Sequence, residues 1–378
     1  MSTDGTSKPS VLIVGGLGFI GRYLAKYIHE NNLASELRIV DKVLPQLAWL
    51  APEFEEACSK ERFVQADASR EQSYPRIFDR ANGQQFDYVI NCAGETRYSQ
   101  PDEVYQLRSY TLSVGLGKEA ARRGVRAFVE CSSAMVYKSG SSPRKEGDKT
   151  QPWNKLCEWK LKAGEELRKI PGLNLIILRF PHIYGDYCSG YFGTGICLGR
   201  VYKYLDKEFE MLYTKDLKLN TLHVNDAARA LWIAAEWRAS KGTVAPGDES
   251  VPIVFNVVDH NNTSQAHIAE ALSSVFDLKC SFLGSLASQL AKLSFDEVID
   301  EMNELVLQAW ADLLSEKGIT RPGPISPFLE RDMFKDQDLA IDGTLFETTT
   351  GFRPEREAFT VDSMKEIIES YKRMGWWP

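Results

Sequence analysis

Residues 11–21 read VLIVGGLGFIG, and this stretch decides the fold. The run Val11–Val14 is apolar without interruption, as in a strand that is buried on both faces of a parallel sheet. A G-x-x-G-x-x-G series follows and leads into a helical pattern over residues 22–32 with apolar positions at Leu24, Ala25 and Ile28. A strand, a glycine-rich turn and a helix in this order predict the first βαβ unit of a dinucleotide-binding fold.

The glycines of this series, Gly15, Gly18 and Gly21, have separate roles. The first permits a tight turn, the second lets the backbone approach a pyrophosphate, and the third lets the helix pack close to the strand. Phe19 and Ile20 lie in the same turn, just before the predicted helix, whose free N–H groups and dipole attract phosphate. We therefore predict that residues 15–21 bind the pyrophosphate of a dinucleotide.

Asp41 indicates which dinucleotide the chain binds. It ends the next strand, residues 37–40, and stands twenty residues beyond Gly21. A carboxylate at this place accepts hydrogen bonds from the adenosine ribose hydroxyls and repels a 2′-phosphate. The sequence thus predicts NAD(H) as the cofactor rather than NADP(H).

The alternation of strands and helices continues along the chain. Further strands are predicted over residues 62–65, 88–91, 127–130, 173–178 and 253–258, and helices over residues 73–80, 104–123, 158–169, 265–276 and 294–316. Residues 221–237 are predicted to form a short strand followed by a helix. This order predicts an α/β fold with a Rossmann-type, doubly wound parallel sheet and a smaller, mixed C-terminal substrate-binding region. The expected boundaries are a flexible tail at 1–9, a Rossmann domain at 10–180 completed by about 221–260, and a substrate-binding region at 181–220 and 261–378.

The composition of the chain argues against several classes of function. The chain has 378 residues, a formal net charge of -7 and scattered basic residues, which gives no electrostatic reason to expect nucleic-acid binding. No apolar run is long enough to span a membrane, and residues 1–9 lack a signal-peptide core. The seven cysteines show no zinc-ligand or redox spacing. We expect a cytoplasmic protein with reduced thiols and no metal.

Several later motifs agree with one known family in their letters, order and context. They are QAD at 65–67, NCAG at 91–94, SSAMVY at 132–137, LRFPHIYG at 178–185 and HVND at 223–226. With the glycine series, in which Val14 stands where a threonine is usual, they make the chain resemble the extended short-chain dehydrogenase/reductases, or NAD-dependent epimerase/dehydratase family. The resemblance runs from about Val11 to about Asp226.

The resemblance implies roles for individual residues. Asp67 would contact the adenine ring, and Asn91 and Ala93 would lie in a turn beneath the cofactor. Ser133 and Lys160 would stand near the nicotinamide, with Lys160 binding its ribose. Pro181, in the motif at 178–185, completes the expected cofactor site. Members of this family often dimerise through a four-helix bundle, so the resemblance also implies a homodimer.

One position departs from the family pattern. An active-site tyrosine is expected four residues before the lysine, where both side chains share a helix face. Four residues before Lys160 stands Leu156, which has no proton to exchange. Loss of a positioned acid or base costs ~10²- to 10⁴-fold in rate. With Lys160 as the lysine, Pro152 stands at the family's proline position and Ala163 follows in register. A shifted register would pair Glu158 with Lys162, but it would break both of these matches.

The departure leaves alternative functions open. The first is an oxidoreductase, isomerase or lyase that acts on a small organic substrate with a non-standard acid or base. Tyr137, Tyr98, Tyr184 and Glu95 are candidates for that group, with Tyr137 favoured because it follows Ser133. The second is a catalytically inactive NAD(H)-binding regulatory or scaffold subunit with a protein partner. A structural protein without cofactor is disfavoured by the intact glycine series.

Overall fold

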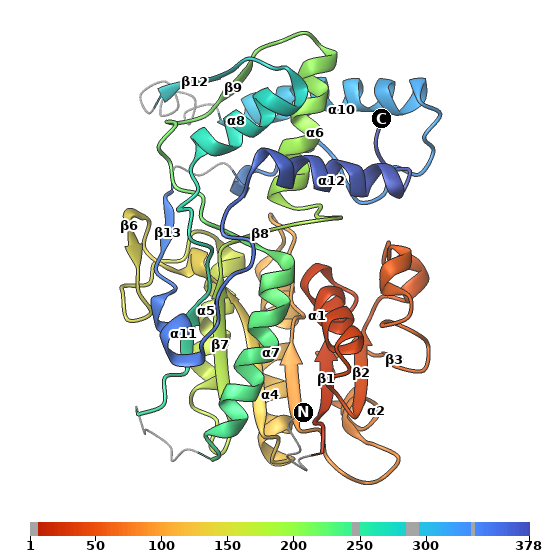
Figure 1. Ribbon diagram of the computed structural model, residues 1–378, viewed down its shortest axis with the longest axis vertical. Coiled ribbons are helices and arrows are strands. Elements are labelled where there is room, and N and C mark those ends of the chain that lie inside the picture. Colours follow the sequence, from red (N-terminus) through yellow and green to blue (C-terminus); the bar gives the residue numbers. More distant parts are fainter. Residues whose placement is uncertain (1–6, 244–249, 285–294, 334–336) are drawn as a thin grey trace.

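The computed structural model describes residues 7–243, 250–284, 295–333 and 337–378. Figure 1 shows a sheet with helices on both of its faces and, beyond one end of its strands, a second region made mainly of helices. The described part of the chain begins at the far end of the sheet, and the C-terminus lies among the helices.

The central sheet has seven strands in the order β11-β7-β5-β4-β1-β2-β3, and every neighbouring pair is parallel. This confirms the predicted doubly wound parallel sheet. The strands are β1 (Ser10–Val14), β2 (Glu36–Asp41), β3 (Phe63–Gln65), β4 (Tyr88–Asn91), β5 (Ala127–Ser133), β7 (Leu175–Phe180) and β11 (Val254–Asn256).

Strand β1 shows why the sheet forms at this place. Its side chains alternate between the two faces, and all of them are apolar and buried after Ser10. Val11 and Ile13 join the core on the side of α1 and α7, whereas Leu12 and Val14 join the core on the side of α2 and α4. A strand buried on both faces needs this continuous apolar run.

Helices cover both faces of the sheet (Figure 1). Those that pack near it are α1 (Phe19–Glu30), α2 (Tyr74–Phe78), α3 (Asp102–Tyr105), α4 (Leu112–Arg122), α5 (Lys155–Leu167), α7 (Val224–Ser240) and α11 (Thr344–Thr350). The predicted helix at 104–123 contains a π-helical turn, Gln106–Thr111, between α3 and α4. Such turns are frequent at functional sites because they redirect side chains.

The second region contains α6 (Tyr191–Tyr204), α8 (Gln265–Phe276), α10 (Phe295–Glu316) and α12 (Val361–Arg373). Three short parallel pairs accompany the main sheet: β8 (His182–Tyr184) with β10 (Thr221–His223), β9 (Phe209–Met211) with β12 (Cys280–Phe282), and β6 (Gly140–Arg144) with β13 (Leu339–Ile341). Within the ranges described above, no helix has both the length and the apolar character needed to cross a membrane.

Candidate cofactor site

The predicted cofactor residues gather at the carboxyl ends of the parallel strands. Gly15 follows β1, Asp41 ends β2, Asn91 ends β4 and Ser133 ends β5. The strand order reverses direction between β1 and β4, and ligands of doubly wound sheets bind at such a switch point. The topology therefore brings together residues that are far apart in the sequence.

The glycine turn is too tightly packed for side chains. Gly15 has φ +75°, and a Cβ atom there would lie 2.6 Å from the backbone nitrogen of Ala93. A Cβ atom at Gly21 would overlap the carbonyl oxygen of Gly15. Gly18, at the N-terminus of α1, is exposed. Bare backbone thus faces the open side of the turn, as a pyrophosphate requires.

The Asp41 carboxylate is held against this turn. Its Oδ2 accepts a hydrogen bond from the backbone N–H of Leu17 at 3.2 Å, and its Oδ1 accepts one from Val43 at 3.1 Å. A carboxylate accepts about four hydrogen bonds in all, so capacity remains for ribose hydroxyls. The position fits the role predicted for Asp41.

Arg22 is a residue of the site that sequence reasoning missed. Its guanidinium donates to the carbonyl oxygens of Leu17 at 2.6 Å, Ala48 at 2.9 Å and Trp49 at 3.1 Å. It therefore ties the glycine turn to the loop that follows β2. The one sequence signal was an arginine directly after Gly21, and its partners 26 and 27 residues away cannot be read from spacing.

A buried polar network supports the turn at 91–94. Asn91 Oδ1 accepts from the Ala93 N–H at 3.1 Å, and its side-chain amide donates to Ser113 Oγ at 3.0 Å and to Glu130 Oε2 at 2.8 Å. Ser113 donates in turn to Glu130 Oε1 at 2.8 Å. Glu130, which the sequence analysis did not single out, fixes the side chain of Asn91 and with it the turn beneath the expected nicotinamide.

The Glu130 carboxyl makes stability depend on pH. Burial raises its pKa from 4.5 to about 7, although the Lys160 charge and the hydrogen bonds from Asn91 and Ser113 oppose the shift. Its contribution to stability is fully present below the unfolded pKa and is lost as pH rises through about 7. The loss is on the order of 3 kcal/mol, because one pKa unit corresponds to ~1.4 kcal/mol.

We expect Glu130→Gln to remove this pH dependence, since glutamine keeps one acceptor and one donor for Asn91 and Ser113 without ionising. Urea denaturation of both proteins between about pH 5 and pH 8 measures the effect. The difference in free energy of unfolding should move in favour of the variant as pH rises. A difference that stays constant across this range would mean that Glu130 ionises normally.

Lys160 spans from α5 to the carboxyl end of β5. Its Nζ donates to the Cys131 carbonyl at 3.1 Å, and a Cβ atom on Gly94 would lie 3.5 Å from the same nitrogen. Ser133 Oγ accepts from the Met135 N–H at 3.1 Å. Lys160 thus reaches the turn at 91–94, the place that the resemblance assigns to it.

Leu156 lies one helical turn before Lys160 on α5. Its side chain is only 9% exposed and belongs to an apolar cluster that includes Ala134, Val136 and Cys157. Position 156, where the sequence analysis expects the family's tyrosine, therefore presents a hydrocarbon side chain.

Two of the proposed replacement acids are engaged elsewhere. The Tyr137 hydroxyl donates to Asn256 Oδ1 at 2.7 Å and accepts from Arg179 at 2.7 Å, with the residue 2% exposed. The Tyr184 hydroxyl donates to the Ala358 carbonyl at 2.9 Å and is also buried. Both hydroxyls are used to hold the fold, so we do not retain them as acid candidates.

Glu95 is held as a carboxylate. Burial would raise its pKa, but hydrogen bonds from Arg97 and Arg108 outweigh that effect and lower the pKa to about 2. The ion-pair distances are 2.9 Å to Arg97 and 2.6 Å to Arg108, and the π-helical turn carries Arg108 toward the carboxylate. An acid this strong is not protonated near neutral pH, so it cannot supply a proton.

Tyr98 is the remaining candidate. Its ring packs against the cluster that contains Leu156. Burial raises the pKa of its phenol, and the neighbouring Cys157 and Asp332 raise it further. Tyr98 therefore packs against the same apolar cluster as Leu156, and its phenol releases its proton less readily than that of a free tyrosine.

The remaining predicted residues lie just after strands or at the start of α1. Asp67 Oδ1 accepts from the Ser69 N–H at 3.1 Å and from its hydroxyl at 2.7 Å, just beyond β3. Pro181 is buried immediately after β7. Phe19 and Ile20 form the first residues of α1.

The last motif of the sequence links the sheet to the C-terminal region. His223 caps α7 by accepting from the Asn225 N–H at 3.3 Å. Asp226 is fully buried and accepts from the backbone N–H groups of Glu355 and Arg356, both at 2.9 Å. It also pairs with Arg229 at 2.6 Å. This carboxylate therefore fastens residues 355–356 to the start of α7.

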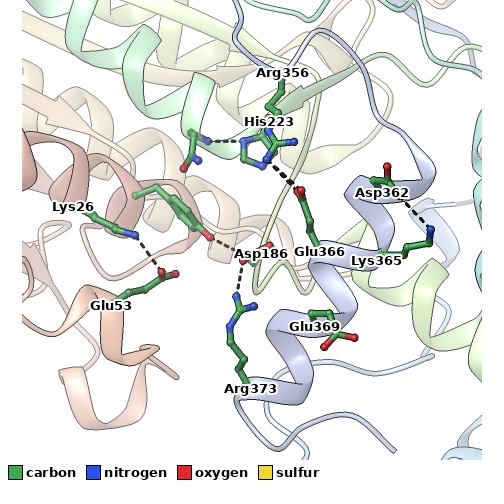
Figure 2. Close-up of a pocket in the computed structure, with 12 residues that line it drawn as sticks. Lys26, Glu53, Asp186, His223, Arg356, Asp362, Lys365, Glu366, Glu369 and Arg373 are labelled. Atoms are coloured by element: carbon green, nitrogen blue, oxygen red, sulfur yellow. Dashed lines mark hydrogen bonds and ion pairs between the residues drawn. The ribbon is translucent and has the colours of Figure 1, made fainter.

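A cavity of about 450 Å³ lies between α1 and α12, and its lining is shown in Figure 2. Five acidic and four basic side chains line it. Several are paired, with Lys26 3.1 Å from Glu53 and Arg373 2.7 Å from Asp186. The cavity contains none of the predicted cofactor residues. It is thus separate from the site at the strand ends.

The fold and the site together define a Rossmann-type dinucleotide-binding protein. A model of the NAD dependent epimerase/dehydratase family matches residues 11–247. The chain therefore belongs to the NAD-dependent epimerase/dehydratase family, which confirms the resemblance seen in its motifs. NAD, the cofactor predicted from Asp41, is the cofactor of this family. Comparison with curated proteins finds no match.

Solved structures of similar fold include three bacterial epimerases. ADP-L-glycero-D-manno-heptose-6-epimerase of Helicobacter pylori is 16% identical with a TM-score of 0.66, covering 98% of both chains. UDP-glucuronic acid 4-epimerase of Bacillus cereus, in complex with UDP-glucuronic acid and NAD, is 14% identical with a TM-score of 0.65, covering 97% of this chain and 99% of that one. UDP-glucose 4-epimerase of Thermus thermophilus, in complex with NAD, is 14% identical with a TM-score of 0.62, covering 96% and 99%. At these identities the likeness concerns the fold.

Proposed function

We propose that this protein binds NAD(H) at the strand ends but has lost tyrosine-dependent hydride transfer, and that it acts as an NAD(H)-responsive regulatory or scaffold subunit. The observation that carries the proposal is the contrast between two residues of α5. Lys160 still reaches the turn at 91–94, whereas Leu156, one turn earlier, is buried in an apolar cluster.

The residues at the strand ends suit separate parts of the cofactor. Residues 15–21 would hold the pyrophosphate, Asp41 the adenosine ribose and Asp67 the adenine edge. Lys160 and Ser133 would hold the nicotinamide end. Bound NAD would accept a hydride and bound NADH would donate one. What this chain lacks is a group that exchanges the accompanying proton at Leu156, a loss of ~10²- to 10⁴-fold in rate.

Tyr98 supports a second candidate function, that of an enzyme. Its ring packs on the Leu156 cluster, so its phenol could replace the missing one. A small organic substrate would then be oxidised, reduced or epimerised with Tyr98 as acid. Because the similar epimerases act on nucleotide-linked sugars, UDP-sugars are the first substrates to test.

Fluorescence titration of the full chain with NADH, with NADPH alongside, tests cofactor binding. We expect saturable binding that prefers NADH and weakens at least about tenfold in Asp41→Ala, a change of ~1.4 kcal/mol. Glu53→Ala is the matched control, because Glu53 is an acid of the separate cavity. Failure of the wild-type protein to bind either cofactor would overturn the proposal.

Leu156→Tyr tests whether position 156 is the active-site position of the family's tyrosine, and the test requires no knowledge of the substrate. The new phenol should titrate below its usual pKa of about 10 because the positive charge of Lys160 favours the phenolate. Tyrosine absorbance against pH measures this, and the effect should vanish in Leu156→Tyr combined with Lys160→Met. A new tyrosine that titrates at or above about 10 would show that Leu156 does not occupy the active-site position.

The same variants separate regulator from enzyme. A regulatory subunit should show no NADH-linked turnover of UDP-sugars in the wild type and a gain in Leu156→Tyr. Turnover in the wild type that is lost in Tyr98→Phe would instead establish the enzyme.

A further inference from the structure

Two cysteine thiols lie in contact on the floor of the cofactor site. Strands β4 and β5 pair in parallel, with Asn91 opposite Glu130 as the last pair. Cys92 and Cys131 come next, Cys92 directly after β4 and Cys131 within β5, and their sulfur atoms are 3.6 Å apart. Both are free thiols, Cys131 buried and Cys92 partly exposed.

Each of these cysteines is joined to a part of the cofactor site. Cys92 precedes Ala93, whose backbone nitrogen would lie 2.6 Å from a Cβ atom on Gly15. The carbonyl of Cys131 accepts the hydrogen bond from Lys160 at 3.1 Å. A displacement of either backbone would therefore move the glycine turn or the lysine that faces the nicotinamide.

We propose that Cys92 and Cys131 are an oxidation site, in which a peroxide converts the two thiols into a disulfide that weakens NAD(H) binding. The first half of the proposal stands on the geometry of the thiols alone. The second half rests on the proposed function, because it concerns the affinity for the cofactor.

The chemistry is balanced with hydrogen peroxide as oxidant. The thiolate of Cys92, the more exposed of the two, attacks one peroxide oxygen, the O–O bond breaks and hydroxide leaves, which gives a sulfenic acid. The Cys131 thiol then attacks the Cys92 sulfur, the S–O bond breaks, and the leaving oxygen takes up the Cys131 proton and departs as water. Two thiols are oxidised by two electrons, and one peroxide is reduced to two waters.

The surroundings of the two cysteines determine which of them reacts first with the peroxide. The hydrogen bond with Cys92 and burial raise the pKa of the Cys131 thiol. A thiol that stays protonated is a poor first nucleophile. Cys131 is thus suited to the second step, where its partner is already in contact.

Closing the bond requires the two sulfur atoms to approach each other. An S–S bond is about 2.05 Å long, well below the present separation of the sulfur atoms. Rotation of the two side chains and movement at the ends of β4 and β5 both shorten this separation, and the part taken up by the backbone moves the Ala93 turn and the Cys131 carbonyl. We expect the NADH affinity of the oxidised protein to fall at least about tenfold and to recover when a dithiol reduces it.

Thiol counting and peptide mass spectrometry of the full chain, before and after treatment with hydrogen peroxide, test the oxidation site. The wild type should fall from seven free thiols to five, with a disulfide-linked peptide pair carrying Cys92 and Cys131. Cys92→Ser and Cys131→Ser should not form this cross-link. Cys280→Ser, the control for another partly exposed cysteine, should form it normally.

NADH titrations of the same samples test the effect on binding. Affinity should fall on oxidation of the wild type and of Cys280→Ser, but not of the Cys92→Ser and Cys131→Ser variants. If no disulfide joins these residues, the oxidation site is refuted. If it forms and affinity is unchanged, the link to cofactor binding is refuted. If the reduced protein itself does not bind NADH, the proposed function fails, whereas the mass spectra still decide the oxidation site.

Discussion

Gly15→Ala is expected to abolish measurable NADH binding and to lower the free energy of unfolding by about 2–5 kcal/mol. An alanine in the left-handed region costs ~1–2 kcal/mol, and Gly15 has φ +75°. Its Cβ atom would also stand 2.6 Å from the Ala93 nitrogen. Overpacking of this kind costs ~1–3 kcal/mol, and the atom that must give way is backbone within the cofactor site.

A matched control separates the two costs. Gly83 has φ +72° but open space around its missing side chain. Gly83→Ala should therefore lose only the ~1–2 kcal/mol of backbone strain and keep NADH binding. Urea denaturation and NADH titration of both variants measure the difference. Equal losses in stability, with binding retained in both, would show that the glycine turn tolerates a side chain.

Asp226→Ala is expected to destabilise the protein by about 3–5 kcal/mol, the range for breaking a buried ion pair. The carboxylate accepts hydrogen bonds from the Glu355 and Arg356 N–H groups and also forms an ion pair with the Arg229 side chain. Its removal leaves two backbone donors without their acceptor and takes the closest partner from the Arg229 guanidinium, which keeps its contacts with Glu355 and the Arg353 carbonyl. Thermal and urea denaturation measure the loss, and limited proteolysis should show new cleavage near residues 353–358.

Glu355→Ala is the control within the same network. Its side chain is 70% exposed and lies 3.3 Å from Arg229. Exposed pairs contribute ~0–1 kcal/mol, so this variant should remain close to the wild type. A large loss in Glu355→Ala, or a small one in Asp226→Ala, would contradict the fastening role given to Asp226.

The parts of the fold that were predictable depend on local pattern. The apolar run of β1, the glycines after it and Asp41 lie within 31 residues, and their meaning follows from spacing. The predicted helix at 265–276 coincides with α8 for the same reason, since its apolar residues repeat at helical intervals.

Helix α6 shows where pattern was insufficient. It is buried on several sides, and at Gly199 a Cβ atom would lie 2.8 Å from Leu272 and Phe276 of α8. A helix that needs glycines for close packing has a weak apolar stripe and residues that disfavour a helix. The sequence therefore showed no clear period over residues 191–204.

The polar contacts of the site were the least predictable part. Tyr137 follows Ser133 closely in the chain, and that nearness favoured it as an acid. In the fold its hydroxyl meets Asn256, 119 residues away. The partners of Glu130 and Arg22 are likewise set by neighbouring strands and loops. Such pairings depend on the tertiary structure, so they cannot be predicted from the spacing of residues in the sequence.

The position of β11 has a practical consequence for dissecting this protein. Strand β7 ends at Phe180, but its outer neighbour β11 is supplied by residues 254–256, after the chain has passed through α6 and α7. A recombinant fragment that stops at 180 would leave the apolar strand β7 with unpaired backbone groups along one side, an edge that invites aggregation. The cofactor-binding half therefore cannot be separated from the rest of the chain at residue 180. Chimeras with relatives should exchange it only together with β11.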